Sequence, residues 1–211
     1  MEIVYFDELE STQVYLSDKI RSGEITSNTA ICAFIQSAGI GSRDNTWQSK
    51  QGNLHVSFCI KTQELAQDLP LASASIYFAF LMKEVLQRKN SKVWIKWPND
   101  FYIEDKKIGG LMSSKINDFL VVGMGINLKY APFNAEILDI EVDITKLLNE
   151  YFSYVDEKIL WKNIFSKYML EFEKSRNFFI HNEGKILSLK DALLYKDGSI
   201  LLDNKRIYSL R

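Results

Sequence analysis

Three short motifs, at residues 96–100, 106–110 and 123–127, hold the residue types in this chain that are best suited to chemistry. They read Lys-Trp-Pro-Asn-Asp, Lys-Lys-Ile-Gly-Gly and Gly-Met-Gly-Ile-Asn. A lysine neutralises an anion, glycines let backbone N–H groups approach a ligand, and a carboxylate can hold a cation. This combination suits an anionic ligand that carries a metal-bound phosphate.

The pattern of the surrounding residues places these motifs on neighbouring strands. Residues 93–97 alternate as in a half-buried strand, and Pro98, which lacks a backbone donor, should end it. Asn99 and Asp100 are then expected on a turn, where short polar side chains can project into a cleft. Further strands are expected at 101–103, at 111–116 opened by Gly109-Gly110, and at 119–122 ending in Gly123-Met124-Gly125, with a polar turn at 104–107. Three antiparallel strands would thus gather the carboxylate, the amide, the lysine and the glycine backbone.

A loop upstream of these motifs is rich in Gly, Ser, Asp, Asn and Thr, and residues 39–44 read Gly-Ile-Gly-Ser-Arg-Asp. Two of the three glycines of a dinucleotide-binding fingerprint are present. Asp44 stands at the third position and no helix pattern follows, which argues against a Rossmann site. The Walker pattern is absent from the sequence as well. The composition leaves two interpretations, a plain surface loop or a mobile loop that closes over a ligand.

The rest of the chain predicts an α+β fold with a mixed or antiparallel sheet. Ser11 or Thr12 should cap a helix that ends near Gly23. Apolar residues from Trp161 to Phe172 form one helical stripe, which favours a surface that packs on the core. Other strands are expected at 3–6, 29–35 and 54–60, other helices at 71–88, 143–155 and 156–181, and short strands from residue 185 around a turn at 196–198.

Composition limits the class of protein. A chain of 211 residues, 46% of them hydrophobic, should form one main domain with a small appendage. Its 26 basic and 27 acidic residues leave no positive excess for nucleic-acid binding. No apolar stretch reaches the ~18 residues of a membrane span, and the first residues lack a signal-peptide pattern. Cys32 and Cys59 lie in apolar runs and are expected to be buried free thiols in a cytoplasmic protein.

The order and spacing of these motifs resemble the biotin protein ligase family, also called biotin–acetyl-CoA-carboxylase ligases. The resemblance runs from about residue 5 to about residue 128. It rests on Lys-Trp-Pro-Asn-Asp followed by Lys-Ile-Gly-Gly, and on upstream matches at residues 10–13, 36–43, Trp47 and 52–54.

This resemblance implies an enzyme that uses ATP and Mg²⁺ to activate biotin as biotinyl-5′-AMP, and then transfers it to a lysine of a biotin carboxyl carrier protein. The expected fold is a mixed-sheet catalytic domain at 1–183, followed by an abbreviated SH3-like β segment at 184–211. The N-terminal DNA-binding domain of some relatives is expected to be absent.

The resemblance also implies roles for particular residues. Lys107 should contact the biotin carboxylate and the α-phosphate, while Lys106 fits a solvated turn lysine. The family's two loop arginines are Ile40 and Ser42 here, so Arg43 is expected to replace part of the missing charge as a second catalytic residue. The biotin-binding residues implied are Ser11, Thr12, Gln36, Gly39, Gly41, Lys107, Gly110 and Gly125. The ATP-binding residues implied are Trp47, Asn99, Asp100 and Asn127, with Asp100 also a Mg²⁺ ligand.

Each of these roles has a plain structural alternative. Ser11 and Thr12 could serve only as helix caps, Trp47 only as a hydrophobic anchor, and Arg43 and Asp100 only as a solvated side chain and a turn residue. Two other functions are also open, a lipoate or octanoate ligase of related fold and a non-catalytic biotin-binding or regulatory protein. A homodimer is one assembly that the sequence allows.

Overall fold

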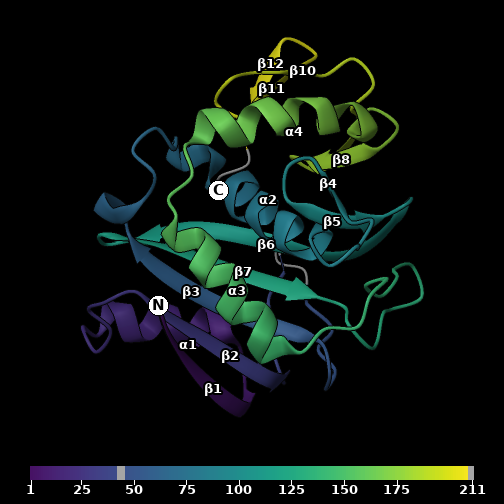
Figure 1. Ribbon diagram of the computed structural model, residues 1–211. Helices are drawn as coiled ribbons and strands as arrows, with labels where there is room; N and C mark the ends of the chain where they lie inside the picture. The colour runs from purple at the N-terminus through teal and green to yellow at the C-terminus, as the bar shows by residue number, and fades with distance from the viewer. Residues whose placement is uncertain (42–45, 209–211) are drawn as a thin grey trace.

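A seven-stranded mixed sheet forms the frame of the protein (Figure 1). The computed structural model describes residues 1–41 and 46–208. The strand order is β1-β2-β3-β7-β6-β5-β4; β1 and β2 are parallel, and every other neighbouring pair is antiparallel. The strands are β1 (Glu2–Leu9), β2 (Thr29–Gln36), β3 (Leu54–Lys61), β4 (Trp94–Lys96), β5 (Asp100–Ile103), β6 (Lys106–Ile116) and β7 (Phe119–Ile126). The expected α+β class with a mixed sheet is confirmed.

Helices cover both faces of this sheet, so alternate residues of the central strands enter two different cores. In β3, Phe58 belongs to the larger core with α2 (Ala74–Gln87), whereas Cys59 packs in a smaller core with α1 (Thr12–Arg21). The helices α3 (Ile144–Asp156) and α4 (Trp161–Ser175) complete the layer on the side of α2 (Figure 1). The residues of the expected stripe pack there: Trp161, Ile164, Tyr168 and Phe172 are buried, and Phe165 is partly buried against the same core.

The first helix begins where its capping residue predicts. The side chain of Ser11 accepts a hydrogen bond from the backbone of Val14, and Thr12 is the first helical residue. The helix ends at Arg21, and Gly23 follows with a positive φ of 77°. The cap places Ser11 and Thr12 just after β1, where the Thr12 hydroxyl reaches Gln36 at the end of β2 and Ser57 of β3.

The motif strands differ from expectation in where they begin and end. Asp100 was expected on a turn but is the first residue of β5, because only residues 97–99 are needed to reverse the chain before Asp100 pairs with Lys96 and Gly110. The glycine pair at 109–110 lies inside β6 rather than at its start, since the turn before it is the short Glu104-Asp105. Gly123 and Gly125 likewise lie within β7.

Short antiparallel strands form the C-terminal part of the described chain. They are the pair β8 (Phe179–Asn182) and β9 (Lys185–Ser188), and the sheet of β10 (Leu193–Leu194), β11 (Ile200–Leu202) and β12 (Lys205–Ile207). The indole of Trp97 donates to the Gly198 carbonyl at 2.9 Å, and that of Trp161 to the Lys196 carbonyl at 2.8 Å. The expected boundary at 183/184 falls in the turn between β8 and β9 and stays a prediction. Within residues 1–41 and 46–208, none of the helices has the length and hydropathy that crossing a bilayer requires.

Candidate functional site

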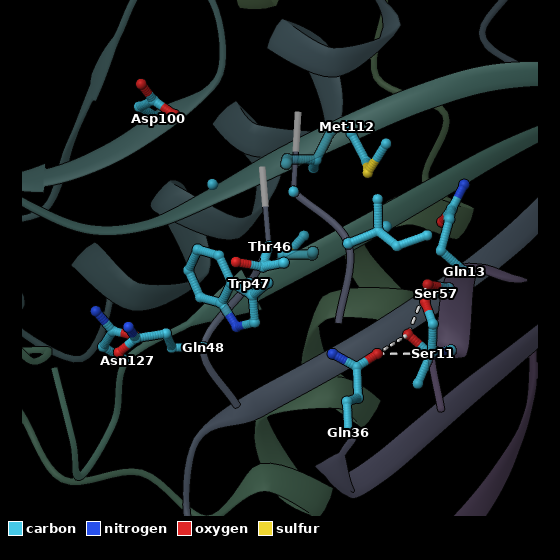
Figure 2. Close-up of a pocket in the computed structure, with 18 of the residues that line it drawn as sticks. Ser11, Gln13, Gln36, Thr46, Trp47, Gln48, Ser57, Asp100, Met112 and Asn127 are labelled. Atoms are coloured by element: carbon cyan, nitrogen blue, oxygen red, sulfur yellow. Dashed lines mark hydrogen bonds between the residues drawn. The ribbon is translucent and has the colours of Figure 1, made fainter. Parts of the chain in front are cut away.

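A cavity of about 330 Å³ lies between the start of α1, the strands β6 and β7, and the segment that follows β2. Its size falls in the range of small-ligand sites. The motifs singled out in the sequence do meet here: the wall contains Ser11, Thr12, Gln36, Gly41, Trp47, Asp100, Lys107, Gly110, Gly125 and Asn127. Figure 2 shows Ser11, Gln13, Gln36 and Ser57 at one end and Asp100 at the other, with Trp47 between them.

Hydroxyl and amide groups line one end of the cavity. The side-chain oxygen of Gln36 accepts hydrogen bonds from the backbone N–H of Thr12 at 2.8 Å and from its hydroxyl at 3.0 Å. The hydroxyls of Thr12 and Ser57 lie 2.8 Å apart. Because the Gln36 oxygen is occupied, its amide nitrogen is the group left for another partner. This end therefore offers hydrogen bonds of both polarities to a small polar ring.

A buried histidine, His55, is linked to Gln36 through hydrogen bonds of Ser49. Burial lowers the pKa of His55 to about 4, so its ring is neutral near pH 7. A neutral ring protonated on Nδ1 is consistent with its two shorter contacts: Nδ1 then donates to the Ala33 carbonyl at 3.3 Å, and Nε2 accepts from the Ser49 hydroxyl at 3.1 Å. The Ser49 oxygen in turn accepts the backbone N–H of Gln36 at 2.8 Å. These hydrogen bonds connect Gln36 and Ser49, the two ends of the segment 36–49. The sequence alone assigned His55 no role.

Charged groups gather at the other end. The ammonium nitrogen of Lys107 lies 2.7 Å from one oxygen of Asp100, and that of Lys96 lies 3.6 Å from the other. Lys107 keeps 38% of its side chain exposed and lines the cavity, whereas Lys96 is buried. Lys106 points to Glu136 at 3.6 Å with 58% exposure, which fits the solvated lysine expected there. The arrangement carries net positive charge where an anion could enter.

Between the two ends, the indole of Trp47 lies flat against the backbone of β7. A Cβ atom added at Gly125 would meet the Trp47 ring at 2.6 Å, so only glycine leaves room for it. The two described arms of the loop, residues 39–41 and 46–49, pair with each other. The backbone N–H of Trp47 donates to the Gly39 carbonyl at 2.8 Å, and Ile40 forms a β-bridge with Thr46. The indole N–H of Trp47 is buried without a hydrogen-bond partner among the described residues. It is thus a donor that a ligand could satisfy.

Two expected site residues, Gly39 and Asn99, are described by the structure and do not line this cavity. Gly39 pairs with Trp47 in the loop, where its missing side chain lets the Trp47 carbonyl approach. Asn99 supports β6, because it exchanges backbone and side-chain hydrogen bonds with Leu111. Arg43 lies outside the described residues, so its role stays a prediction, as does closure of the loop around it.

The cavity also contains residues that the sequence reasoning missed. The side-chain oxygen of Gln13 is buried without a partner among the described residues, directly over Gly123. Ser57 and Met112 are the residues that pair with Gly123 on the two neighbouring strands. Gly123 and Gly125 face the same side of β7, so their cross-strand partners were the signal that could have identified this wall.

A cation has one candidate ligand here, and it is already engaged. Asp100 is the only acidic side chain of the cavity wall in the described part of the chain, and each of its oxygens faces a lysine. The described residues contain no group of three or more His, Cys, Asp or Glu side chains that could hold a metal ion. This donor set fits a magnesium ion that arrives bound to phosphates, because such an ion takes only one or two protein carboxylates.

Comparison with known protein families identifies the family of this chain. The model of the biotin/lipoate A/B protein ligase family matches residues 5–129. Among curated relatives, the bifunctional ligase/repressor BirA of Escherichia coli is 35% identical over 127 residues, which are 57% of this chain and 38% of that protein. Biotin–protein ligase 2 of Arabidopsis thaliana is 31% identical over 135 residues, 60% of this chain and 40% of that protein. The chain therefore spans less than half the length of these two relatives.

Solved structures match over almost the whole chain. The biotin acetyl coenzyme A carboxylase synthetase of Helicobacter pylori, crystallised with bound biotinylated ATP, is 38% identical with a TM-score of 0.93, covering 98% of this chain and 99% of that one. The biotin protein ligase of Aquifex aeolicus, in complex with biotin and ATP, has a TM-score of 0.77 at 22% identity over 100% and 96% of the two chains. The second likeness shows the fold alone.

Proposed function

Because the chain belongs to the biotin/lipoate A/B protein ligase family, we propose that it is an ATP-dependent biotin–protein ligase. It activates biotin as biotinyl-5′-adenylate and transfers the biotinyl group to a lysine of a biotin carboxyl carrier protein. One observation carries this proposal: a single cavity has a hydroxyl and amide end and a cationic end, which are the two kinds of surface that biotin and an activated carboxylate require.

The polar end is the proposed site of the biotin ring system. The ureido group of biotin has two N–H donors and one carbonyl acceptor. Thr12 and Ser57 offer hydroxyls, Gln36 offers its amide nitrogen, and Ser11 lies beside them in the wall. Gln13 adds an unpaired acceptor. Ser11 and Thr12 thus combine the capping role with a binding role, because a hydroxyl at a helix start can face a ligand.

The cationic end is the proposed place of adenylation. An oxygen of the biotin carboxylate attacks the α-phosphorus of ATP, and the bond to the pyrophosphate oxygen breaks. Both reactants are anions, so the Lys107 ammonium stabilises the charge that gathers in the transition state. In the second step a neutral lysine amine of the carrier attacks the acyl carbon. The bond to the phosphate oxygen breaks, AMP leaves and the amine loses one proton.

The nucleotide is proposed to lie beside Trp47, Asp100 and Asn127, with Mg²⁺ on its phosphates and Asp100 as the protein ligand. The Asn127 amide holds the neighbouring segment by donating to the Glu136 carbonyl at 3.2 Å. That segment reaches the cavity at Ala135, which forms a bridge with Lys107. ATP as co-substrate and the two buried thiols fit the cytoplasmic location expected from the sequence.

The decisive experiment is exchange of labelled pyrophosphate into ATP with biotin, lipoate or octanoate supplied in turn. Exchange that depends on biotin is expected, followed by biotinylation of a carrier domain detected as a mass increase. Exchange supported by lipoate or octanoate instead would assign the rival ligase activity. Biotin binding without any exchange would leave a non-catalytic biotin-binding protein.

A further inference from the structure

Asp100 has two lysine partners of different character. Its Oδ1 lies 2.7 Å from the Lys107 ammonium, and its Oδ2 lies 3.6 Å from the Lys96 ammonium. Lys107 belongs to the wall of the cavity and Lys96 does not. Only 9% of the Lys96 side chain is exposed, against 38% of Lys107. The inner lysine is therefore fixed, while the outer one can reach a ligand.

The strand register keeps these groups together. Lys96 and Asp100 are direct partners across the antiparallel pair β4 and β5, and the Lys96 ammonium lies 5.6 Å from the centre of the Tyr102 ring. Gly110 pairs with Asp100 from the other side, and a Cβ atom there would stand 3.2 Å from Oδ1 of Asp100 and 3.5 Å from the Lys107 ammonium. The Lys107 side chain thus passes over Gly110, which has no side chain, to reach the Asp100 carboxylate.

This geometry creates a conflict for the proposed reaction. Without a ligand, the Lys107 charge is engaged by Asp100 rather than directed at an incoming anion. Moving Lys107 to a phosphate or carboxylate would leave Asp100, which is mostly buried, without its nearest partner. An uncompensated charge in such surroundings is strongly unfavourable. In a complex without magnesium, such as the complex with the adenylate, a protein group other than Lys107 must therefore stabilise Asp100.

We infer that Lys96 is a positioning residue that neutralises Asp100 when Lys107 turns to the anion of the reacting ligand. The inference rests on the proposed ligase function. It gives the cluster of two lysines and one carboxylate a purpose: the net charge of +1 is free to act on the ligand while Asp100 stays paired. Lys96 itself touches no reacting atom.

The electrostatics of Lys96 agree with this exchange. Lys96 and Lys107 lie on different oxygens of the same carboxylate, at 3.6 Å and 2.7 Å, so each lysine is attracted by Asp100 and repelled by the other lysine. When a ligand anion neutralises the Lys107 charge, the repulsion between the two lysines falls, while the attraction between Lys96 and Asp100 remains. Lys96 and Asp100 thus pair more strongly at the moment when Lys107 leaves.

The test compares an anionic ligand with a neutral one. Calorimetry measures the binding of a non-hydrolysable, anionic biotinyl-adenylate analogue and of biotin amide, which has no carboxylate. Lys96→Met should weaken the analogue by about tenfold, a usual size for coupling between sites, and leave biotin amide unchanged. The exposed Lys115→Met on β6 is the matched control and should change neither. If Lys96→Met does not fold, Lys96→Gln serves in the same comparison.

A double-mutant cycle separates positioning from packing. In an Asp100→Asn background there is no charge for Lys96 to neutralise, so adding Lys96→Met should have no further effect on binding of the analogue. Equal weakening of both ligands by Lys96→Met, or the same loss in both backgrounds, would overturn the inference. A wild-type protein that fails to bind the analogue would instead count against the proposed function.

Discussion

Replacing Gly125 by alanine tests whether the cavity depends on the packing of the Trp47 indole against Gly125. The new Cβ atom would stand 2.6 Å from Cε2 and 2.7 Å from Cζ2 of the indole. Ordinary contact begins near 3.4 Å, so the ring must move by about 0.8 Å. The indole ring is rigid, and the backbone N–H of Trp47 is hydrogen-bonded to the Gly39 carbonyl. Relief of the clash therefore requires rotation of the whole ring or a shift of this paired backbone.

Misplacement by about 1 Å can reduce catalysis by about 10²-fold, and we expect a loss of that order in biotin-dependent pyrophosphate exchange. Circular dichroism should show an intact fold, because the displaced atoms face the cavity rather than the core. Binding of ATP should weaken more than binding of biotin, since Trp47 is the proposed neighbour of the nucleotide. Tryptophan fluorescence of the free protein should also change.

Gly123→Ala is the matched control on the same face of the same strand. Its Cβ atom would stand 2.5 Å from the side-chain oxygen of Gln13, which is the end of a flexible side chain and can turn aside. We expect less than about tenfold loss in exchange, because Gln13 can take another rotamer while Thr12, Ser57 and Gln36 still line the proposed biotin end. If Gly125→Ala loses no more activity than Gly123→Ala, the site does not require the packing of the Trp47 indole against Gly125.

Three further outcomes are expected. Lys107→Ala should lower adenylate formation by about 10²–10³ without unfolding the protein, and a folded variant within tenfold of wild type would contradict the role of that charge. Because the pKa of His55 is about 4 in the folded protein, the unfolded chain binds more protons between pH 6.5 and about 4. The free energy of unfolding should therefore fall across that window as pH drops, by on the order of 3 kcal/mol. Urea titrations of His55→Gln should not show this loss. Hydrogen exchange at 39–41 and 46–49 should slow when biotin and ATP bind together, and unchanged protection in a complex shown to have formed would argue against ordering of these arms.

The strand pattern around the motifs could be predicted from local sequence alone. Period-two alternation and Pro98 locate β4, and the polar turn expected at 104–107 indicates the start of β6, which begins at Lys106, inside that expected turn. The serine and threonine at the end of β1 predict the cap of α1 for the same local reason. These signals depend only on neighbours along the chain, which is why they could be read directly.

The parts that escaped prediction depend on contacts between distant segments. Ser57 reaches the cavity because β3 pairs with β7, and the sequence of β3 contains no sign of that partner. His55 was assigned no role because its partners, Ser49 and the Ala33 carbonyl, meet it only after β2 and β3 are aligned. The strand position of Asp100 has the same cause, since its pairing with Gly110 extends β5 by one residue. Local propensity carries no information about such alignment.

The hydrogen bond from the Trp97 indole to Gly198 joins residues that are 101 positions apart. A ribosome that adds about 5–20 residues per second needs about 5–20 s to cover that distance. During synthesis, the strand that carries Lys96 is therefore finished long before the turn that covers Trp97 exists. A growing chain must keep a large aromatic surface protected over this interval. Assistance from chaperones should thus matter more for this protein than its modest size suggests.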